Sequence, residues 1–211
     1  RPLTGQSIAM LTLMLPFAPP IMRFIDCWTN PGFELVGPKA TGKSTLLLAA
    51  SSVYGGIGGT SGSRYYETWN VTSAGMETLS QRHCDCLLIL DELNTLTAGG
   101  TTGAKRQAYN GIVFNLGSGI DKTKFGEKRN AQRFMCYLSS SNTPLAQELA
   151  GGAADIVSAA ADRLLTISVD AGRGLGVFDF VPEEFRSSKD LIDSVKSAAS
   201  KNHGVAIRAY L

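Results

Sequence analysis

The sequence is short of cysteine and has no long, uninterrupted apolar run. Four cysteines among 211 residues do not suggest a disulfide framework, and they fit a protein of a reducing compartment. The most apolar N-terminal stretch, residues 8–22, contains Thr12 and three prolines and is shorter than the ~18–20 residues that span a bilayer. It also lacks the cleavage pattern of a secretory signal. We therefore expect a cytoplasmic protein with no membrane partner.

Internal repeats are absent and charge is sparse, at 18% of residues with a net charge of +2. Such a small net charge says nothing about binding to nucleic acid. With 44% hydrophobic residues, the chain can bury a core, which we expect over residues 33–180. An N-terminal helical segment, 1–32, is expected to pack on this core. Because the chain stops within a helical pattern, segment 181–211 is expected to begin a truncated lid or a following module.

Helical and strand patterns alternate along the chain, which predicts an α/β fold with a mostly parallel sheet flanked by helices. The clearest strand is the unbroken apolar run 86–90, which is typical of a strand covered on both faces. The other expected elements are strands over 33–36, 133–139 and 164–169, a buried helix that ends near Pro16, and helices over 44–54, 74–82, 104–116, 145–150 and 187–200.

The segment VGPKATGKSTL at 36–46 satisfies the phosphate-loop pattern G-x-x-x-x-G-K-[ST] between an apolar strand and a helix. Glycines let backbone N–H groups curl around an anion, and the helix N-terminus adds partial positive charge. We expect Lys43 to reach the β- and γ-phosphates of ATP and the Ser44 hydroxyl to coordinate Mg²⁺. The alternative is a glycine turn before an ordinary helix, with Lys43 in solvent. The nucleotide-binding residues would be Gly37, Pro38, Lys39, Ala40, Thr41, Gly42, Lys43, Ser44 and Thr45.

The run CLLILDE at 86–92 ends in two acidic residues at the carboxyl end of the buried strand. Ligands of open α/β sheets bind at that end. Asp91 is expected to hold Mg²⁺ through its waters, and Glu92 to polarise the water that attacks the γ-phosphate. Because transfer to a small-molecule acceptor needs no such carboxylate, the pair favours a hydrolase over a kinase. The alternative is an acidic N-cap of the next segment.

The strand expected at 133–139 runs into the sequence SSSN. An asparagine there is placed to hydrogen-bond the γ-phosphate or the attacking water from the side opposite the acids. Asn142 is therefore the candidate sensor, with Ser140 and Ser141 as rivals. The alternative is an ordinary loop asparagine before Pro144.

Arg163 follows the small-residue run SAAAD and directly precedes an apolar strand. In ring-shaped ATPases, an arginine at such a position points into the nucleotide pocket of the neighbouring subunit, where it is worth ~10³–10⁵ in rate. We expect this role because position and flanking pattern both fit it. The alternative is an intramolecular ion pair with Asp162 or Asp155.

Basic residues concentrate between 103 and 133, where seven basic and two acidic side chains give +5 in a chain of net +2. A turn is expected at 124–126, with basic residues on both sides. A basic tip with an aromatic ring suits the sugar–phosphate backbone of a nucleic acid. The alternative is a hairpin whose charge serves solubility. The candidate DNA contacts are Lys122, Lys124, Phe125, Lys128 and Arg129.

Together these residues resemble the additional-strand class of P-loop ATPases, the AAA+ proteins, and the helicases in which a hairpin precedes the sensor strand. More closely, the chain resembles the family called domain of unknown function 927, found in phage and mobile-element proteins, often beside primase modules. The segment TWNVTSAGMETL is not a general ATPase motif, and it points to this narrower family. The resemblance is carried by FELVGPKATGKSTLLLAASSVYG, TWNVTSAGMETLSQRHCDCLLILDEL, AYNGIVFNLGSG, YLSSSN and AADRLLTISVDAGRGLGVFD.

The resemblance implies an ATP-driven homo-oligomeric motor, a hexameric ring that acts as a DNA helicase on single-stranded or forked DNA during replication of an element. It places the phosphate loop at 37–45, the Mg²⁺ and water-activating acids at Asp91 and Glu92, the sensor at Asn142 and the arginine finger at Arg163. A primase module in the same or an adjacent chain is a further implied partner.

Two other functions compete with a motor. An ATP-gated switch or loader would assemble with partner proteins without unwinding DNA, and only the basic hairpin separates it from a motor. A small-molecule kinase is disfavoured by the pair Asp91 and Glu92. A helical lid with a second sensor arginine is not evident in the pattern, and Arg208 is the candidate for that role.

Overall fold

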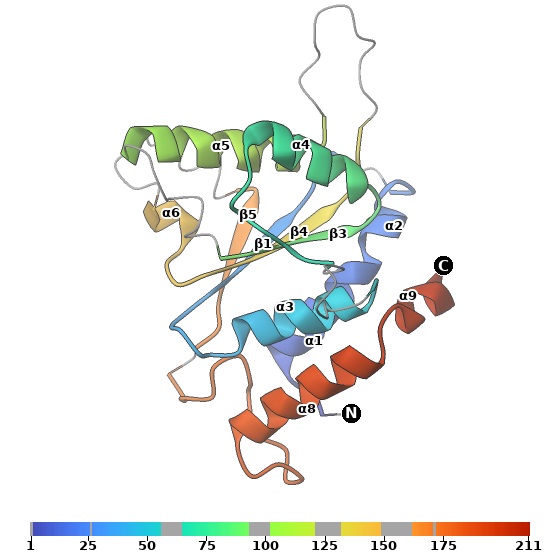
Figure 1. The fold of residues 1–211 in the computed structure, drawn as a ribbon, viewed down its shortest axis with the longest axis vertical. Helices are drawn as coiled ribbons and strands as arrows, with labels where there is room; N and C mark the ends of the chain where they lie inside the picture. Colours follow the sequence, from blue (N-terminus) through green and yellow to red (C-terminus); the bar gives the residue numbers. More distant parts are fainter. Residues whose placement is uncertain are drawn as a thin grey trace, which may run out of the picture.

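A five-stranded parallel sheet, in the order β2-β3-β4-β1-β5, carries the fold (Figure 1). The computed structural model describes residues 2–25, 27–55, 65–92, 102–120, 132–148, 162–170 and 172–211. The strands are β1 (Gly32–Val36), β2 (Glu67–Thr68), β3 (Leu87–Asp91), β4 (Cys136–Ser141) and β5 (Leu164–Ser168). The predicted α/β fold with a parallel sheet is thereby confirmed.

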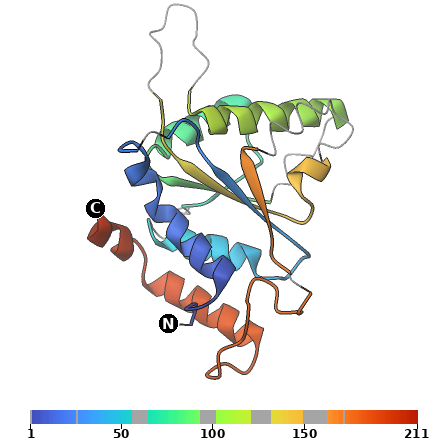
Figure 2. The same ribbon diagram turned by 180° about the vertical axis from the view of Figure 1, so that it is seen from behind.

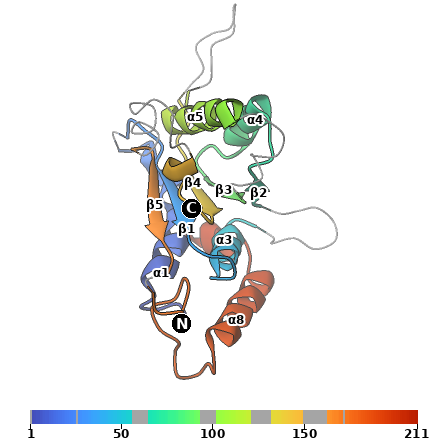
Figure 3. The same ribbon diagram turned by 90° about the vertical axis from the view of Figure 1, so that its left-hand side faces the viewer.

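Helices cover both faces of this sheet. On one face lie α4, α5 and α6, and on the other lie α1 and α3, with α8 packed outside α3 (Figure 3). Viewed from behind, α1 runs beside α3 and the C-terminal helices lie beyond them (Figure 2). The helices are α1 (Ser7–Met14), the 3-10 turn η1 (Leu15–Phe17), α2 (Pro19–Met22), α3 (Lys43–Ser52), α4 (Ser73–Arg82), α5 (Thr102–Ser118), α6 (Leu145–Glu148), α8 (Ser188–Lys201) and α9 (Val205–Tyr210).

The apolar run of β3 shows why the sheet needs both layers. Leu87 and Ile89 belong to the core cluster on the α3 side, whereas Leu88 and Leu90 belong to the cluster under α4 and α5. All four side chains are fully buried. Successive strand residues face opposite sides, so a strand covered on both faces is apolar throughout.

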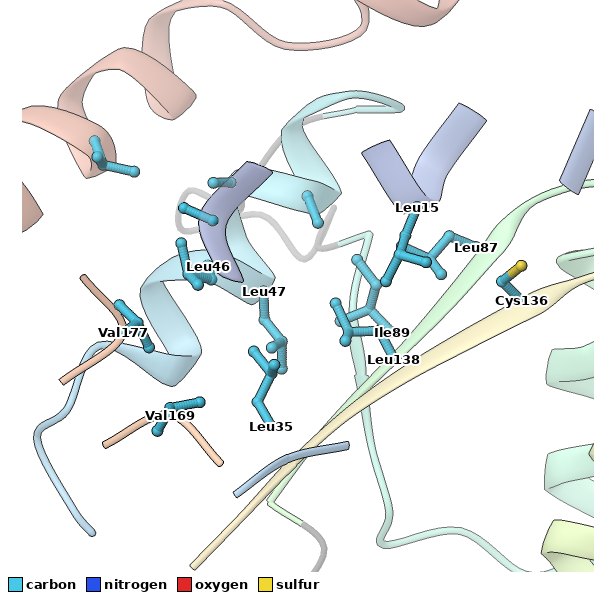
Figure 4. Packing of buried hydrophobic residues seen from close by; sticks show 14 of the residues in the cluster. Leu15, Leu35, Leu46, Leu47, Leu87, Ile89, Cys136, Leu138, Val169 and Val177 are labelled. Atoms are coloured by element: carbon cyan, nitrogen blue, oxygen red, sulfur yellow. The ribbon is translucent and has the colours of Figure 1, made fainter. Parts of the chain in front are cut away.

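The α3 side of the core is filled by leucines from helix and sheet together. Leu47 of α3 lies beside Leu35 of β1, Leu46 lies toward Val177, and Ile89 and Leu138 belong to the same cluster (Figure 4). Burial of this helix face fixes α3, and therefore the loop that precedes it, against the carboxyl half of β1.

Three sequence predictions differ from the structure in detail. The strand expected at 133–139 begins only at Cys136, because the N–H of Arg133 bonds the Gly119 carbonyl and that of Met135 bonds the Asn30 side chain. The expected N-terminal helix ends at Met14, and the chain continues through η1 and α2. Its burial was overestimated, since the Met14 side chain is 65% exposed.

The sequence did not predict β2, which has only two residues and no periodicity to read. Among the described residues, no helix combines the length and the apolar character needed to cross a bilayer.

The strand order decides which chain segments meet. Since all paired strands are parallel, the loops after β1, β3 and β4 leave from one edge of the sheet. The strand β4 lies between β1 and β3, so the residues after it stand between the phosphate loop and Asp91. Arg163 directly precedes β5. It therefore lies where the strands begin, at the end of the sheet opposite the phosphate loop.

Candidate functional site

A cleft of about 750 Å³ opens at the carboxyl edge of the sheet. Four elements contribute to it: the phosphate loop with the start of α3, the end of β3, the end of β4, and α8. The lining residues are Lys39, Ala40, Thr41, Gly42, Lys43, Ser44, Thr45, Asp91, Glu92, Ser140, Ser141, Asn142, Ile192 and Lys196. Residues from the phosphate-loop, acidic-strand and sensor patterns therefore meet in one place, although the predicted nucleotide-binding residues Gly37 and Pro38 are not among the lining residues.

The phosphate loop turns into α3 at a left-handed glycine. Gly42 has φ +95°, and its carbonyl accepts the first bonds of the helix, from the N–H groups of Thr45 and Leu46. A Cβ atom at Gly42 would lie 2.8 Å from the Val177 side chain, so no larger residue fits without a shift. Ala40 also has a positive φ, of 64°. The open helix N-terminus at this turn is a favourable site for an anion.

The Lys43 ammonium group lies between the phosphate loop and the loop after β4. Its Nζ donates to the carbonyls of Gly37 at 2.6 Å and Pro38 at 2.7 Å, and lies 3.4 Å from Oδ1 of Asn142. The residue is only 8% exposed. Burial lowers the pKa of Lys43, and the nearby charge of Asp91 opposes that shift. The Lys43 ammonium group is thus largely shielded from water and makes its hydrogen bonds to oxygen acceptors of the protein.

The two acids occupy distinct places at the end of β3. Oδ1 of Asp91 accepts a hydrogen bond from the Ser140 hydroxyl and another, at 3.0 Å, from the Glu92 N–H. Glu92 adopts φ +57°, a left-handed conformation that is uncommon for residues other than glycine. Such backbone strain is typical of functional sites, and here it turns the chain sharply where Glu92 borders the cleft.

The three candidates for the sensor, Ser140, Ser141 and Asn142, have different hydrogen-bond partners. Ser140 bonds Asp91, the Ser141 hydroxyl donates to the Thr143 carbonyl at 2.8 Å, and Asn142 approaches Lys43. Within the part of the chain that the structure describes, Asn142 is the one of the three whose side chain approaches the phosphate-loop lysine, and it lines the same cleft as the acids.

Arg163 lies far from its own cleft, at the amino end of β5. Its guanidinium carbon is 4.5 Å from the centroid of the Phe114 ring on α5. Its carbonyl accepts bonds from the Gly32 N–H at 3.0 Å and the Tyr137 hydroxyl at 2.8 Å. The rival ion-pair partner Asp155 lies outside the described residues. A role in catalysis would therefore require the cleft of another subunit.

The predicted DNA-contacting residues fall outside the part of the chain that the structure describes: Lys122, Lys124, Phe125, Lys128 and Arg129. Arg133, counted with this basic region, is only 7% exposed. Its burial removes it from the residues that present charge to a ligand.

Sequence reasoning missed the contribution of α8 to the cleft. Leu191, Val195 and Ala199 of this helix are buried, and Ile192 and Lys196 lie beside them, four residues apart on one face of the helix. A Cβ atom at Gly42 would be 3.8 Å from Cδ1 of Ile192, so α8 passes close to the phosphate loop. The apolar helical pattern was visible, but nothing in it indicated which surface the helix covers.

A glycine-rich segment after β5 supports the phosphate loop from outside. The Val177 N–H donates to the Thr41 carbonyl at 2.9 Å. Gly176, at φ +61°, lies so close that an added Cβ would be 2.2 Å from the same oxygen. The loop that would cradle the anion is thus held by α3, by β1 and by this segment.

We predict that Gly176→Ala destabilises the protein more than Gly174→Ala. Both glycines have φ near +65°, but a Cβ at Gly174 meets nothing within 4 Å. The backbone cost, about 1–2 kcal/mol, is therefore shared, whereas the clash with Thr41 adds about 1–3 kcal/mol. Urea unfolding of both variants measures the difference. Equal destabilisation would contradict the close packing of this segment on the phosphate loop.

Comparison with solved structures supports the fold. A chain described as "SCCmec type IV Cch - active helicase" superimposes with a TM-score of 0.66 at 18% sequence identity. The match covers 100% of the present chain and 35% of that chain, so this chain spans about a third of its length. At this identity the similarity shows a shared fold. No curated protein matches the sequence.

A family model described as "Domain of unknown function (DUF927)" matches residues 1–146, more than half of the chain. It includes the phosphate loop, the acidic strand and the strand that ends before Asn142. The resemblance noted in the sequence is thereby confirmed, and the chain belongs to the DUF927 family.

Proposed function

We propose that this chain is the ATPase core of a helicase-like motor that hydrolyses ATP with Mg²⁺. The observation that carries the proposal is the meeting of Lys43, Asp91, Glu92 and Asn142 in one cleft, delivered by three neighbouring parallel strands. A cation, a paired acid and a polar amide around one helix N-terminus match what a triphosphate and its water nucleophile require.

The residues present fit a nucleotide and its metal. Phosphate oxygens would replace the Gly37 and Pro38 carbonyls as acceptors for the Lys43 ammonium group. Ser44 and Asp91 both line the cleft and supply the hydroxyl and carboxylate oxygens that Mg²⁺ prefers. When bound, the metal neutralises charge on the phosphates. Glu92 would then orient and deprotonate the attacking water, with Asn142 holding it or the γ-phosphate from the other side.

The position of Arg163 supports an oligomeric enzyme. Because this side chain lies at the edge of the sheet opposite the cleft, it can approach a phosphate only in a neighbouring subunit. In the proposed homo-oligomeric ring, a hexamer, each cleft is completed by the arginine of the next copy. In this proposal residues 33–180 form the ATPase core of the assembly, 1–32 packs on it, and 181–211 begins a lid or a following module.

A DNA substrate is proposed on two grounds. The chain shares its fold with a protein described as an active helicase, and it carries a strongly basic segment before β4. Single-stranded or forked DNA would bind that segment through its phosphates. The competing function, an ATP-gated loader that acts on partner proteins, would use the same cleft without a response to DNA.

Substitutions at Lys43 and Glu92 should separate ATP binding from ATP hydrolysis. Lys43→Ala removes the charge that faces the phosphates and should abolish detectable ATP binding. Glu92→Gln keeps the shape of the cleft and should bind ATP normally while hydrolysing it about 100-fold more slowly or worse, since it lacks the base. Phosphate release and binding of a fluorescent ATP analogue measure the two effects. Normal turnover by Glu92→Gln would exclude Glu92 as the group that activates water.

Lys196 is proposed as a second cation for the phosphates, since it borders the cleft from α8. Lys196→Ala should weaken binding of ATP by about tenfold through the lost charge-assisted contact. Lys189→Ala is the matched control, because Lys189 lies on the same helix, is exposed and is not among the lining residues of the described cleft. Isothermal titration measures both affinities. Equal affinity in the two variants would remove Lys196 from the site.

The proposed oligomer predicts complementation between two inactive proteins. Arg163→Ala should bind ATP yet lose about 10³-fold in turnover. Mixed with Lys43→Ala protein, it should recover activity, because an intact cleft then meets an intact arginine from the neighbour. Turnover of the mixture against that of each protein alone is the measurement. A mixture no more active than its parts, with ATP-dependent assembly confirmed by native mass spectrometry, would exclude Arg163 as the finger.

The motor and the loader differ in their response to DNA. Single-stranded DNA should raise ATP turnover, and Lys124→Ala should lower the ratio of stimulated to basal turnover. The stimulation should also fall as salt rises, since phosphate contacts release counterions. The exposed Lys201 on α8 provides a control substitution outside the basic segment. An ATPase that ignores DNA at low salt would favour the loader.

A further inference from the structure

A fully buried carboxylate lies in the middle of the phosphate-loop strand. Glu34 of β1 has no exposed surface, and its register neighbours are Ser139 on β4 and Thr166 on β5. Buried carboxylates are costly unless hydrogen bonds compensate them. A buried acid is unexpected in the sequence FELV. Strands covered on both faces are usually apolar throughout, as the other three residues of this stretch are.

The carboxylate contacts the chain segment that follows the candidate sensor. Oε2 of Glu34 accepts a hydrogen bond from the Leu145 N–H at 3.1 Å and one from the Thr166 hydroxyl at 3.4 Å. Leu145 is the first residue of α6 and comes three residues after Asn142. The contact therefore joins the strand before the phosphate loop to the segment that carries the sensor.

The hydrogen bond from Leu145 to Glu34 holds the chain beyond the point where strand pairing between β1 and β4 ends. The ladder between β1 and β4 ends at Val36 and Ser141, so residues 142–145 leave the sheet without strand pairing. Pro144 has no N–H to donate. The Leu145 N–H is thus a backbone donor just beyond the turn, and Glu34 holds it at a fixed place relative to β1.

The register neighbour of Glu34 on β4, Ser139, also has a buried polar partner. The buried Trp69 donates from Nε1 to the Ser139 hydroxyl at 2.8 Å, and its N–H bonds the Asp91 carbonyl at 3.3 Å. Trp69 belongs to the segment TWNVTSAGMETL, which carries the narrower family resemblance. Trp69 and Leu145 both belong to the buried cluster on the face covered by α5 and α6.

We propose that Glu34 is a positioning residue: it sets the place of Asn142 over the cleft through the Leu145 N–H. The inference rests on the proposed function, because Asn142 is assigned there to the attacking water or the γ-phosphate. Glu34 itself touches neither. Its effect should therefore appear in turnover and leave nucleotide affinity, which depends on Lys43 and the phosphate loop, nearly unchanged.

Three single variants test the hydrogen bond. Glu34→Leu cannot accept from Leu145 and should lower turnover by about tenfold or more, with ATP affinity within about threefold of wild type. Glu34→Gln retains an acceptor oxygen and should keep most of the turnover. Thr166→Val removes the hydrogen bond from Thr166 to the same carboxylate and should also stay close to wild type. Wild-type turnover in a folded Glu34→Leu protein overturns the proposal.

A double-mutant cycle with Asn142→Ala separates positioning from general destabilisation. If Glu34 acts through Asn142, adding Glu34→Leu to Asn142→Ala should lower turnover by less than about twofold further. A reduction in the double variant as large as that in the wild-type background overturns the proposal, because it shows a route that bypasses Asn142.

Hydrogen exchange at the Leu145 amide gives a readout independent of hydrolysis. Exchange should be slow in the wild type and in Glu34→Gln, and about tenfold faster or more in Glu34→Leu. Fast exchange in the wild-type protein overturns the contact even if no Glu34→Leu protein folds. If the wild type does not hydrolyse ATP but exchange at Leu145 is slow, the proposed function is refuted. The hydrogen bond between Glu34 and Leu145 is then still supported.

Discussion

Parallel pairing of β4 with both β1 and β3 is the constraint on which the cleft depends. In register, Val36 lies opposite Ser141 and Leu90 opposite Ser139, so the phosphate loop, the acids and Asn142 all leave the sheet at nearly the same height. A shift of one residue in either ladder would turn every side chain of that strand to the other face. The buried apolar faces of β3 and β4 make such a shift costly. Hydrophobic packing of β3 and β4 thus controls the geometry of a polar site that contains none of the buried leucines of these two strands.

Hydrogen bonds of polar side chains then fix the positions of the loops that leave the parallel strands. The ammonium group of Lys43 holds two carbonyls of its own loop, and the Ser140 hydroxyl holds Asp91. The segment around Gly176 presses on Thr41 from outside. Hydrogen bonds of this kind connect walls of the cleft that come from separate parts of the chain. Preorganised polar groups of this kind are what charge stabilisation in a phosphate site requires.

Much of this architecture could be predicted. The run 86–90 indicated a strand buried on both faces, and the glycine pattern at 37–42 indicated an anion loop, because each depends on local sequence alone. The strand β2 was not predicted. Its two residues form a strand because they pair with β3, and so short a segment shows no strand periodicity in the sequence. The start of β4 was misplaced because the N–H of Met135 finds the Asn30 side chain, a residue more than a hundred positions earlier. Such long-range partners leave no periodic trace.

The sequence by itself determined the chemistry of the site: which residues carry charge, where glycine permits a left-handed turn, and which faces of helices and strands are apolar. These follow from side-chain type and from the periods of helix and strand. Only the tertiary structure decided that α8 brings Ile192 and Lys196 to the cleft, that Arg163 lies at the far edge, and that Glu34 reaches Leu145. An apolar face must be covered, but its period does not specify the partner; shape complementarity between distant segments makes that choice.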